Sequence, residues 1–251
     1  MTTDLFSLAG RTALITGGSR GIGRMIAAGF IAQGAKVYIS ARKAPACQQT
    51  AEEIGAVALP ADVSTMEGMK ALAEAYGRHE SSLDILVNNA GAAWLAPFDD
   101  FPEKGWDKVM DLNVKTPFYL TAALAPMLRA SASAERPAKV INIASIDGIS
   151  VNPQETYPYA ASKAGLIHLT RRMAKTLIAD NIVVSAIAPG AFASDMNIAA
   201  RDEAEAVAAR VPAKRIGRDE DMAGAAIYLA SRAGDYVVGA TLTVDGGVAY
   251  C

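Results

Sequence analysis

The chain has 251 residues, of which 51% are hydrophobic and 20% are charged. These proportions suit a folded protein with a substantial core and argue against intrinsic disorder. The net charge of −2 gives no electrostatic reason to expect nucleic acid or an anionic membrane as partner. The amino-terminal residues lack the basic flank and apolar run of a signal peptide, and no stretch reaches the ~18 apolar residues of a transmembrane helix. We therefore expect a soluble, cytoplasmic protein without nucleic-acid or membrane partners.

Cysteine and histidine show no spacing typical of a metal or redox site. Cys47 and Cys251 lie far apart, and His79 and His168 stand alone. A zinc site needs several such ligands at short intervals, and a redox pair needs two nearby cysteines. We therefore expect free thiols in a reducing compartment and no metal centre.

Short β-branched runs alternate with longer segments of helical period along the chain. The predicted strands are 12–16, 36–40, 56–62, 83–89, 138–145, 182–189 and 241–247. The first predicted helix begins near 23 and the second before 48. Four further helices are predicted over 65–79, 102–129, 158–180 and 219–230. Runs such as "DILV" and "VINI" are apolar throughout, so helices should cover both faces of the sheet. This pattern predicts an α/β fold, a single doubly wound domain over 1–251 with a seven-stranded parallel sheet.

Residues 191–215 interrupt this alternation between the sixth and seventh predicted strands. Their length and mixed polarity suit a helical lid over a substrate site. An exposed helical excursion without function fits about as well. No Pro/Gly/Ser-rich linker divides the chain elsewhere, which favours one domain.

The glycine-rich stretch "TGGSRGIG" at 16–23 follows the first predicted strand and opens the first predicted helix. Gly17 permits a tight turn, Gly21 lets the backbone approach a pyrophosphate, and Gly23 allows close packing of helix on strand. The free amides and the positive end of the helix attract the anion. Turns also use glycine for structural reasons, but this position favours a dinucleotide site. A P-loop is excluded because no Gly-Lys-Ser/Thr occurs.

The end of the second strand, "VYISARK", bears on the choice of dinucleotide. An acidic residue there would bind the adenosine ribose and repel a 2′-phosphate. This chain has Ala41 at about that place, Arg42 just beyond it, and Arg20 inside the glycine turn. Two guanidinium groups and no carboxylate favour NADP(H), and one charge-assisted hydrogen bond of roughly 1.5–3 kcal/mol gives about tenfold or greater preference. The alternative is two ordinary solvated arginines.

The stretch "YPYAASK" at 157–163 contains two tyrosines and one lysine. Residues four apart share a helix face, so Tyr159 and Lys163 can meet, whereas Tyr157 has Ala161 at the matching position. Lowering the pKa of tyrosine from about 10 to about 7–8 requires roughly 3–4 kcal/mol. An ammonium ~4 Å away, at an effective dielectric of about 20, supplies about that much. We predict that Tyr159 is the reactive tyrosine and that Tyr157 is a substrate-side wall or a packed aromatic.

Taken together, these stretches resemble the short-chain dehydrogenase/reductase family. The likeness covers almost the whole chain and includes "TGGSRGIG", Asp62 with Val63, "NNAG" at 88–91, Asn113 in "DLNV", Ser145 in "INIAS", "YAASK" at 159–163, "APG" at 188–190 and "VDGG" at 244–247. Their order and spacing make the match specific. Within the family, "FSLAGRTALITGGSRGIG" and "RASASAERPAKVINIAS" are most similar to 3-oxoacyl reductases of the rhamnolipid-biosynthesis type. The resemblance implies a Rossmann-type fold.

The resemblance also implies a catalytic set of Asn113, Ser145, Tyr159 and Lys163. Tyr159 would protonate the carbonyl oxygen, Ser145 would hold that oxygen, and Lys163 would bind the nicotinamide ribose and lower the tyrosine pKa. Asn113 would anchor a water-mediated proton relay to Lys163. Alone, Ser145 could equally cap a turn and Asn113 could bond local backbone. Besides Tyr159 and Lys163, the implied NADP(H)-binding residues are Gly17, Ser19, Arg20, Gly21, Ile22, Gly23, Arg42, Asp62, Val63, Asn89, Ala90, Gly91, Pro189, Gly190, Phe192 and Ser194.

The expected activity is NADPH-dependent reduction of a carbonyl, most simply of a 3-oxoacyl thioester, to a secondary alcohol. A small cyclic or aromatic ketone is the alternative substrate, and an NADP-sensing or scaffold protein is the non-enzymatic alternative. Such proteins commonly lose the tyrosine or the lysine, and this chain keeps both. A serine hydrolase built on Ser145 lacks the G-x-S-x-G elbow.

Two partner expectations also follow from the resemblance. Carrier-dependent reductases have a base at the end of the helix after the catalytic tyrosine, where this chain has Asp180. Arg171, Arg172 and Lys175 could compensate, yet docking of an acyl carrier protein is in doubt. A homotetramer or homodimer is expected, in which the apolar residues of 114–129 and 160–178 serve a core as readily as an interface. These residues include Phe118, Leu120, Leu124, Leu166 and Leu169.

Overall fold

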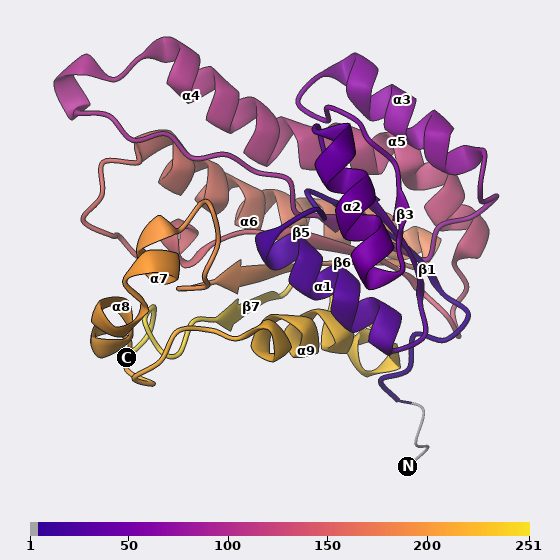
Figure 1. Cartoon of the computed structure of the whole chain (residues 1–251). Coiled ribbons are helices and arrows are strands. Elements are labelled where there is room, and N and C mark those ends of the chain that lie inside the picture. Colours follow the sequence, from indigo (N-terminus) through magenta and orange to yellow (C-terminus); the bar gives the residue numbers. More distant parts are fainter. Residues whose placement is uncertain (1–4) are drawn as a thin grey trace.

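A seven-stranded, entirely parallel sheet forms the centre of the computed structural model, which describes residues 5–251 (Figure 1). The strand order is β3-β2-β1-β4-β5-β6-β7, as in a doubly wound Rossmann-type fold. The predicted sheet is therefore confirmed. Its strands are β1 (Thr12–Thr16), β2 (Lys36–Ser40), β3 (Val57–Ala58), β4 (Ile85–Asn88), β5 (Ala138–Ile143), β6 (Ile182–Pro189) and β7 (Thr241–Val244).

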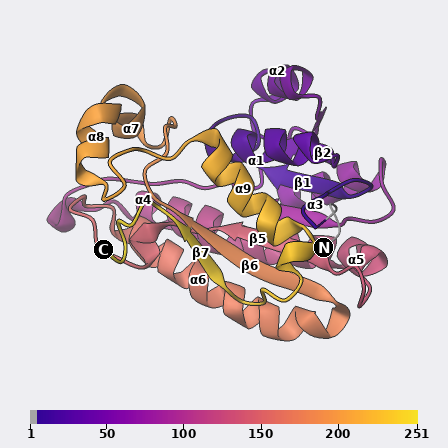
Figure 2. The same ribbon diagram turned by 90° about the horizontal axis from the view of Figure 1, so that it is seen from below.

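Helices cover both faces of this sheet. One layer contains α1, α2 and α9, and the opposite layer contains α3, α5 and α6 (Figure 2). The helices are α1 (Gly21–Ala32), α2 (Ala44–Ile54), α3 (Met66–Gly77), α4 (Glu103–Met110), α5 (Thr116–Ser131), α6 (Tyr157–Leu177), α7 (Ile198–Asp202), α8 (Ala204–Arg210) and α9 (Asp219–Ala230). Within residues 5–251, none of them combines the length and apolar character needed to cross a membrane.

The strands divide the buried side chains into two cores. In β1, Ala13 and Ile15 pack with the layer of α1, α2 and α9, whereas Leu14 packs with the layer of α3, α5 and α6. Alternate side chains of a strand point to opposite faces, so a strand covered on both sides is apolar throughout. This explains why the apolar runs in the sequence identified the strands. Leu120, Leu124 and Leu166 lie in the core, while Phe118 is 44% exposed.

Several observed strands end earlier than predicted, and the remaining residues form loops at one edge of the sheet. β4 ends at Asn88 and β5 at Ile143, which leaves Asn89 and Ser145 in loops. The short β3 leaves Asp62 in the turn before α3. The carboxyl ends of parallel strands share one edge, where α/β folds bind their ligands. The predicted ends of β3, β4 and β5 were therefore too late, because the last predicted residues of each strand lie in the loop that follows it.

The predicted single helix over 102–129 is wrong in its middle. Between α4 and α5 the backbone forms one π-helical turn over Asp111–Lys115. Pro117 has no N–H to donate to the carbonyl four residues before it, so the regular α-helical bonding has to change here. Single π turns inside helices are frequent at functional sites. This one contains Asn113.

A tight contact joins the turn after β1 to the loop after β4. Gly17 has a left-handed φ of 65°, and Asn89 Nδ2 donates to the carbonyls of Thr16 (2.8 Å) and Gly17 (3.1 Å). A Cβ on Gly23 would lie 2.3 Å from Gly17 O and 2.5 Å from Asn89 Nδ2. Gly23 therefore has the packing role that the sequence predicted. α1 begins at Gly21, two residues earlier than expected.

The contact at Gly23 predicts a large effect of one added methyl group. We expect Gly23→Ala to lower the free energy of unfolding by about 2 kcal/mol or more, because backbone atoms have to move to admit Cβ. Gly224→Ala is the matched control, since a Cβ there meets nothing within 4 Å and alanine favours the interior of α9. Urea unfolding of both variants measures the difference. A Gly23→Ala protein as stable as Gly224→Ala would contradict the packing argument.

Candidate active site

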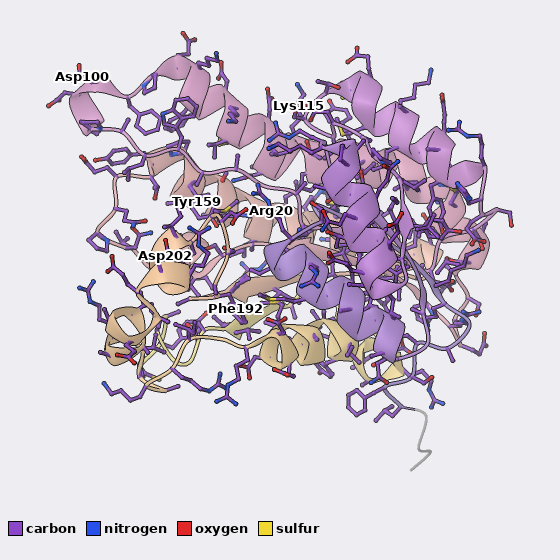
Figure 3. The ribbon with its side chains drawn as sticks, viewed as in Figure 1. Arg20, Asp100, Lys115, Tyr159, Phe192 and Asp202 are labelled. Atoms are coloured by element: carbon purple, nitrogen blue, oxygen red, sulfur yellow. The ribbon has the colours of Figure 1, made fainter. Side chains whose placement is uncertain are left out.

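Tyr159, labelled in Figure 3, and Lys163 lie one turn apart on α6 and come together, as the spacing predicted. Lys163 Nζ is 5.5 Å from the centroid of the Tyr159 ring and donates a hydrogen bond to the carbonyl of Ile143 (2.8 Å). Lys163 is only 5% exposed. The carbonyl at the end of β5 thus fixes a buried ammonium beneath the phenol.

Ser145 follows β5 and has two interactions. Its Oγ accepts a hydrogen bond from the N–H of Asp147 (3.1 Å), which is the capping role that the sequence left open. Its side chain also lies close enough to Tyr159 to act to lower the pKa of that phenol. Ser145 is 7% exposed. The structure therefore brings Ser145, Tyr159 and Lys163 together.

Asn113 uses its whole carboxamide to hold neighbouring elements. Oδ1 accepts from the N–H of Ala92 (2.9 Å), and Nδ2 donates to the carbonyl of Ala92 (2.9 Å) and to Ser162 Oγ (2.9 Å). Ser162 Oγ in turn donates to the carbonyl of Tyr159 (2.8 Å). Asn113 is 1% exposed. It joins the π turn, the loop after β4 and the first turn of α6, and its predicted proton relay stays a prediction.

The sequence predicted that Lys163 lowers the pKa of Tyr159. This prediction is wrong for the protein without a bound cofactor. Burial raises the pKa of Tyr159 to about 12, against the opposing effect of Ser145. Burial likewise lowers the pKa of Lys163 to about 8. Desolvation in the interior is the largest cause of both shifts. The site therefore holds a protonated phenol above a lysine that titrates close to neutral pH.

Asp147 is a half-buried carboxylate that sequence reasoning missed. Its charge acts on both catalytic groups, since it raises the pKa of Tyr159 and opposes the lowering of the pKa of Lys163. It lies two residues after Ser145, so the motif gave its position without indicating its influence. Ser162 was also missed, although it lies within "YAASK". Only the contact with Asn113 reveals its role.

The glycine turn fits the dinucleotide that the sequence predicted. Gly17 and Gly21 both have left-handed φ values, 65° and 50°, which turn the backbone at the amino end of the twelve-residue helix α1. Thr16 Oγ1 accepts from the N–H groups of Asn89 and Ala90 (3.0 Å each) and so fixes the "NNAG" loop beside this turn. The amino end of α1 attracts a phosphate group.

The space between the turn and the catalytic groups is kept open by glycine. A Cβ on Gly91 would lie 3.2 Å from Asn113 Oδ1 and 3.7 Å from Lys163 Nζ. A Cβ on Gly190 would lie 2.6 Å from Asp245 Cβ. A side chain at position 91 would therefore contact Lys163, whereas Gly190 packs against Asp245, which follows β7. These residues fit a nicotinamide ribose next to Lys163, with NADP(H) spanning from there to the glycine turn.

The remaining predicted cofactor residues have mainly structural contacts. Asp62 caps its own turn by accepting from the N–H and hydroxyl of Ser64 (3.1 and 2.7 Å). The carbonyl of Val63 accepts from Thr116 Oγ1 (2.8 Å). The carbonyl of Ser19 accepts from Thr50 Oγ1 (2.9 Å), and Ile22 packs partly into the core. Cofactor binding by these residues stays a prediction.

Arg20 and Arg42 differ in their surroundings. Arg20 forms an ion pair with Asp195, and Asp195 also pairs with Arg201 (3.0 Å). Arg42 is exposed and forms no ion pair or side-chain hydrogen bond among the residues that the structure describes. Ser194 Cβ lies 3.2 Å from where a Cβ on Gly21 would be, so the segment after β6 lies against the glycine turn. Residues 191–215 contain α7 and α8, as predicted, and their role as a lid stays a prediction.

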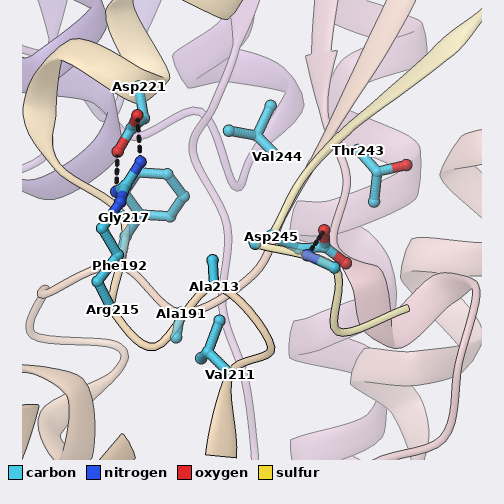
Figure 4. Close-up of a pocket in the computed structure, with 12 residues that line it drawn as sticks. Ala191, Phe192, Val211, Ala213, Arg215, Gly217, Asp221, Thr243, Val244 and Asp245 are labelled. Carbon is cyan, nitrogen blue, oxygen red and sulfur yellow. Dashed lines mark hydrogen bonds and ion pairs between the residues drawn. The ribbon is translucent and has the colours of Figure 1, made fainter. Parts of the chain in front are cut away.

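A cavity of about 330 Å³ lies beside Phe192, which is one of its lining residues (Figure 4). Phe192 is 2% exposed and its ring packs on Gly217, where a Cβ would lie 2.3 Å away. Arg215 donates two hydrogen bonds to Asp221 at this cavity (2.5 and 2.9 Å). None of the predicted catalytic residues lines it. Cofactor binding by Phe192 stays a prediction.

The buried position of Lys163 predicts an unusual titration. In protein labelled with ¹³C at lysine Cε, one resonance should titrate with a pKa of about 8 rather than 10.5, because burial disfavours the ammonium. That resonance should be missing from Lys163→Met. A Lys163 resonance that titrates at the ordinary value would contradict the buried geometry.

Comparison with known proteins identifies the family. A family model described as Enoyl-(Acyl carrier protein) reductase matches residues 17–249. The chain is 51% identical over 249 residues to the "Rhamnolipids biosynthesis 3-oxoacyl-[acyl-carrier-protein] reductase" of Pseudomonas aeruginosa, with 96% of this chain and 97% of that protein covered. It is 39% identical over 254 residues to the "5-keto-D-gluconate 5-reductase" of Escherichia coli, with 98% of each covered.

Solved structures agree with these relatives. The "Pseudomonas aeruginosa RhlG/NADP active-site complex" superposes with a TM-score of 0.95 at 49% identity, covering 99% of this chain and all (100%) of that one. A short-chain type dehydrogenase/reductase from Mycobacterium marinum superposes with a TM-score of 0.90 at 33% identity, covering 99% of each chain. Together with the Tyr-x-x-x-Lys pair and its serine, these matches show that the chain belongs to the short-chain dehydrogenase/reductase family of oxidoreductases.

Proposed function

We propose that this protein is an NADPH-dependent reductase that converts a 3-oxoacyl thioester into the 3-hydroxyacyl thioester. The observation that carries the proposal is the buried Lys163 held under the Tyr159 phenol, with Ser145 close to the same phenol. The relative at 51% identity, named a 3-oxoacyl reductase, supports this substrate. The neighbouring structure with NADP in its name supports the cofactor.

Each catalytic side chain has a definable part in such a reduction. When bound, NADPH would supply a hydride to the carbonyl carbon, and the carbonyl oxygen then gains negative charge. The Ser145 hydroxyl donates a hydrogen bond to that oxygen, and Tyr159 transfers its phenolic proton to it. A pKa of about 12 keeps Tyr159 protonated at neutral pH, and an alkoxide is basic enough to take its proton. Lys163, with a pKa of about 8, can then return a proton toward the phenolate.

Partner and assembly expectations remain part of this proposal. Asp180 lies where carrier-dependent reductases have a base, which argues against docking of an acyl carrier protein. Its carboxylate forms an ion pair with Arg129 (2.8 Å). A small ketone remains the alternative substrate, and a homotetramer or homodimer in the cytoplasm remains the expected form. The exposed Phe118 and Tyr119, at 44% and 42%, are the residues of α5 that suit a contact between copies.

Removal of one hydroxyl tests the proton donor. Tyr159→Phe should lower kcat/KM for NADPH-dependent reduction of acetoacetyl-CoA by about 10²–10⁴-fold, since phenylalanine has no proton to transfer to the carbonyl oxygen. Tyr157→Phe is the matched control two residues away, because its hydroxyl donates to the exposed Glu155 carboxylate (2.9 Å). Steady-state kinetics of both variants give the comparison. Equal activity of the two variants would remove Tyr159 from its proposed role.

The unequal surroundings of the two arginines predict unequal effects on cofactor choice. Arg42→Ala should lower the ratio of kcat/KM with NADPH to that with NADH by about tenfold or more, because Arg42 has no competing partner among residues 5–251. Arg20→Ala should lower it less, because Arg20 has to leave Asp195 to bind a 2′-phosphate. The same ratio in Asp195→Asn should rise. An unchanged ratio in Arg42→Ala would show that the 2′-phosphate is not bound there.

A further inference from the structure

Four bulky aliphatic side chains are exposed in the segments that follow three neighbouring strands. Leu95 (64% exposed) lies after β4, Val151 (99%) after β5, and Met196 (52%) and Ile198 (55%) after β6. β4, β5 and β6 are adjacent and parallel, so these loops leave the same edge of the sheet side by side. Apolar side chains gathered in this way are typical of a surface that binds an apolar group.

The same loops contain the groups proposed for catalysis. Ser145 begins the loop of Val151, and that loop runs directly into α6 with Tyr159. The loops after β4 and β5 are joined, because Ala96 N donates to the carbonyl of Glu155 (3.3 Å). The Glu155 carboxylate also accepts from the N–H of Phe98 (3.3 Å). Leu95 and Val151 therefore belong to a pair of joined loops beside the reacting centre, and Met196 and Ile198 belong to the segment that leaves the same edge of the sheet after β6.

The charges around this edge argue against a substrate that carries a carboxylate on the chain next to the reacting carbonyl. The Asp147 carboxylate is close enough to influence both Tyr159 and Lys163. Asp99 and Asp100 are exposed in the loop after β4. These carboxylates would repel the carboxylate of a keto-sugar acid, and aliphatic side chains offer its hydroxyl groups no hydrogen bonds. An uncharged hydrocarbon chain suits both features.

We propose that this enzyme prefers 3-oxoacyl groups with a long, uncharged hydrocarbon chain, which lies over Leu95, Val151, Met196 and Ile198. The proposal rests on the reductase function proposed above and adds the chain-length preference and the residues that determine it. Each methylene group covered by these side chains leaves water, so the transition state gains affinity as the chain lengthens. A substrate of four carbons reaches few of them.

The test is a chain-length series with a neutral thioester head. N-acetylcysteamine thioesters of 3-oxobutanoate, 3-oxohexanoate and 3-oxooctanoate are assayed with NADPH, together with 5-keto-D-gluconate. We expect kcat/KM to rise by at least about tenfold from four to eight carbons, about twofold for each methylene that is partly buried. Turnover of 5-keto-D-gluconate should fall well below that of the eight-carbon thioester.

Serine variants locate the effect. Leu95→Ser, Val151→Ser and Met196→Ser should each reduce the eight-to-four-carbon ratio of kcat/KM by about two- to fivefold. Val238→Ser is the matched control, because Val238 is 39% exposed and precedes β7 at the opposite edge of the sheet. All four positions are exposed, so the substitutions leave the core intact.

The outcomes separate this proposal from the reductase function. The proposal is supported if kcat/KM of the unaltered protein rises steeply with chain length, if the three loop variants reduce this rise, and if Val238→Ser keeps it. Reduction of the four-carbon thioester without any gain from longer chains overturns it and leaves the reductase function standing. A steep series that the loop variants keep overturns the residue assignment. If none of the thioesters is reduced with either NADPH or NADH, both the chain-length proposal and the reductase function are overturned.

Discussion

The burial of one ammonium group determines how the rest of this site is built. Lys163 Nζ lies in the interior, bonded to the carbonyl that ends β5 and placed under the ring of Tyr159. Removing a charge from water is costly, and the pKa of Lys163 falls to about 8 as a result. The same interior raises the pKa of Tyr159 to about 12 and so keeps the phenol protonated. In the proposed reaction, one region of low polarity thus prepares a proton donor and, directly beneath it, a lysine able to resupply the proton.

The fold keeps these two groups in place through the π turn between α4 and α5. Pro117 breaks the regular helical bonding, and Asn113 then turns its carboxamide toward the loop after β4 and toward Ser162 of α6. Three elements far apart in sequence are joined by one buried side chain. The glycine at position 91 leaves room at the same point, with the catalytic lysine and Asn113 both within van der Waals reach of an added Cβ. Proximity of this kind is what a hydride transfer with a positioned proton donor needs.

Local spacing in the sequence predicted what depends on short-range geometry. Apolar runs gave the seven strands, and the interval of four residues gave the pairing of Tyr159 with Lys163. The π turn was missed because the predicted helix took no account of Pro117. The direction of the Tyr159 pKa was missed because it depends on burial, which the full packing decides. The partner of Arg20 was missed for a related reason, since Asp195 is 175 residues away along the chain and nothing local indicates the pair.

The most direct measurement is a crystal structure of the protein with NADP⁺ and a 3-hydroxyacyl thioester bound. The account predicts that the oxygen at carbon 3 lies within hydrogen-bond distance, about 2.6–3.2 Å, of both Ser145 Oγ and the Tyr159 hydroxyl. Lys163 Nζ should lie on the far side of the phenol from that oxygen and next to the nicotinamide ribose. A complex in which the Tyr159 hydroxyl points away from the bound oxygen, or in which Lys163 leaves its buried position, would contradict the account.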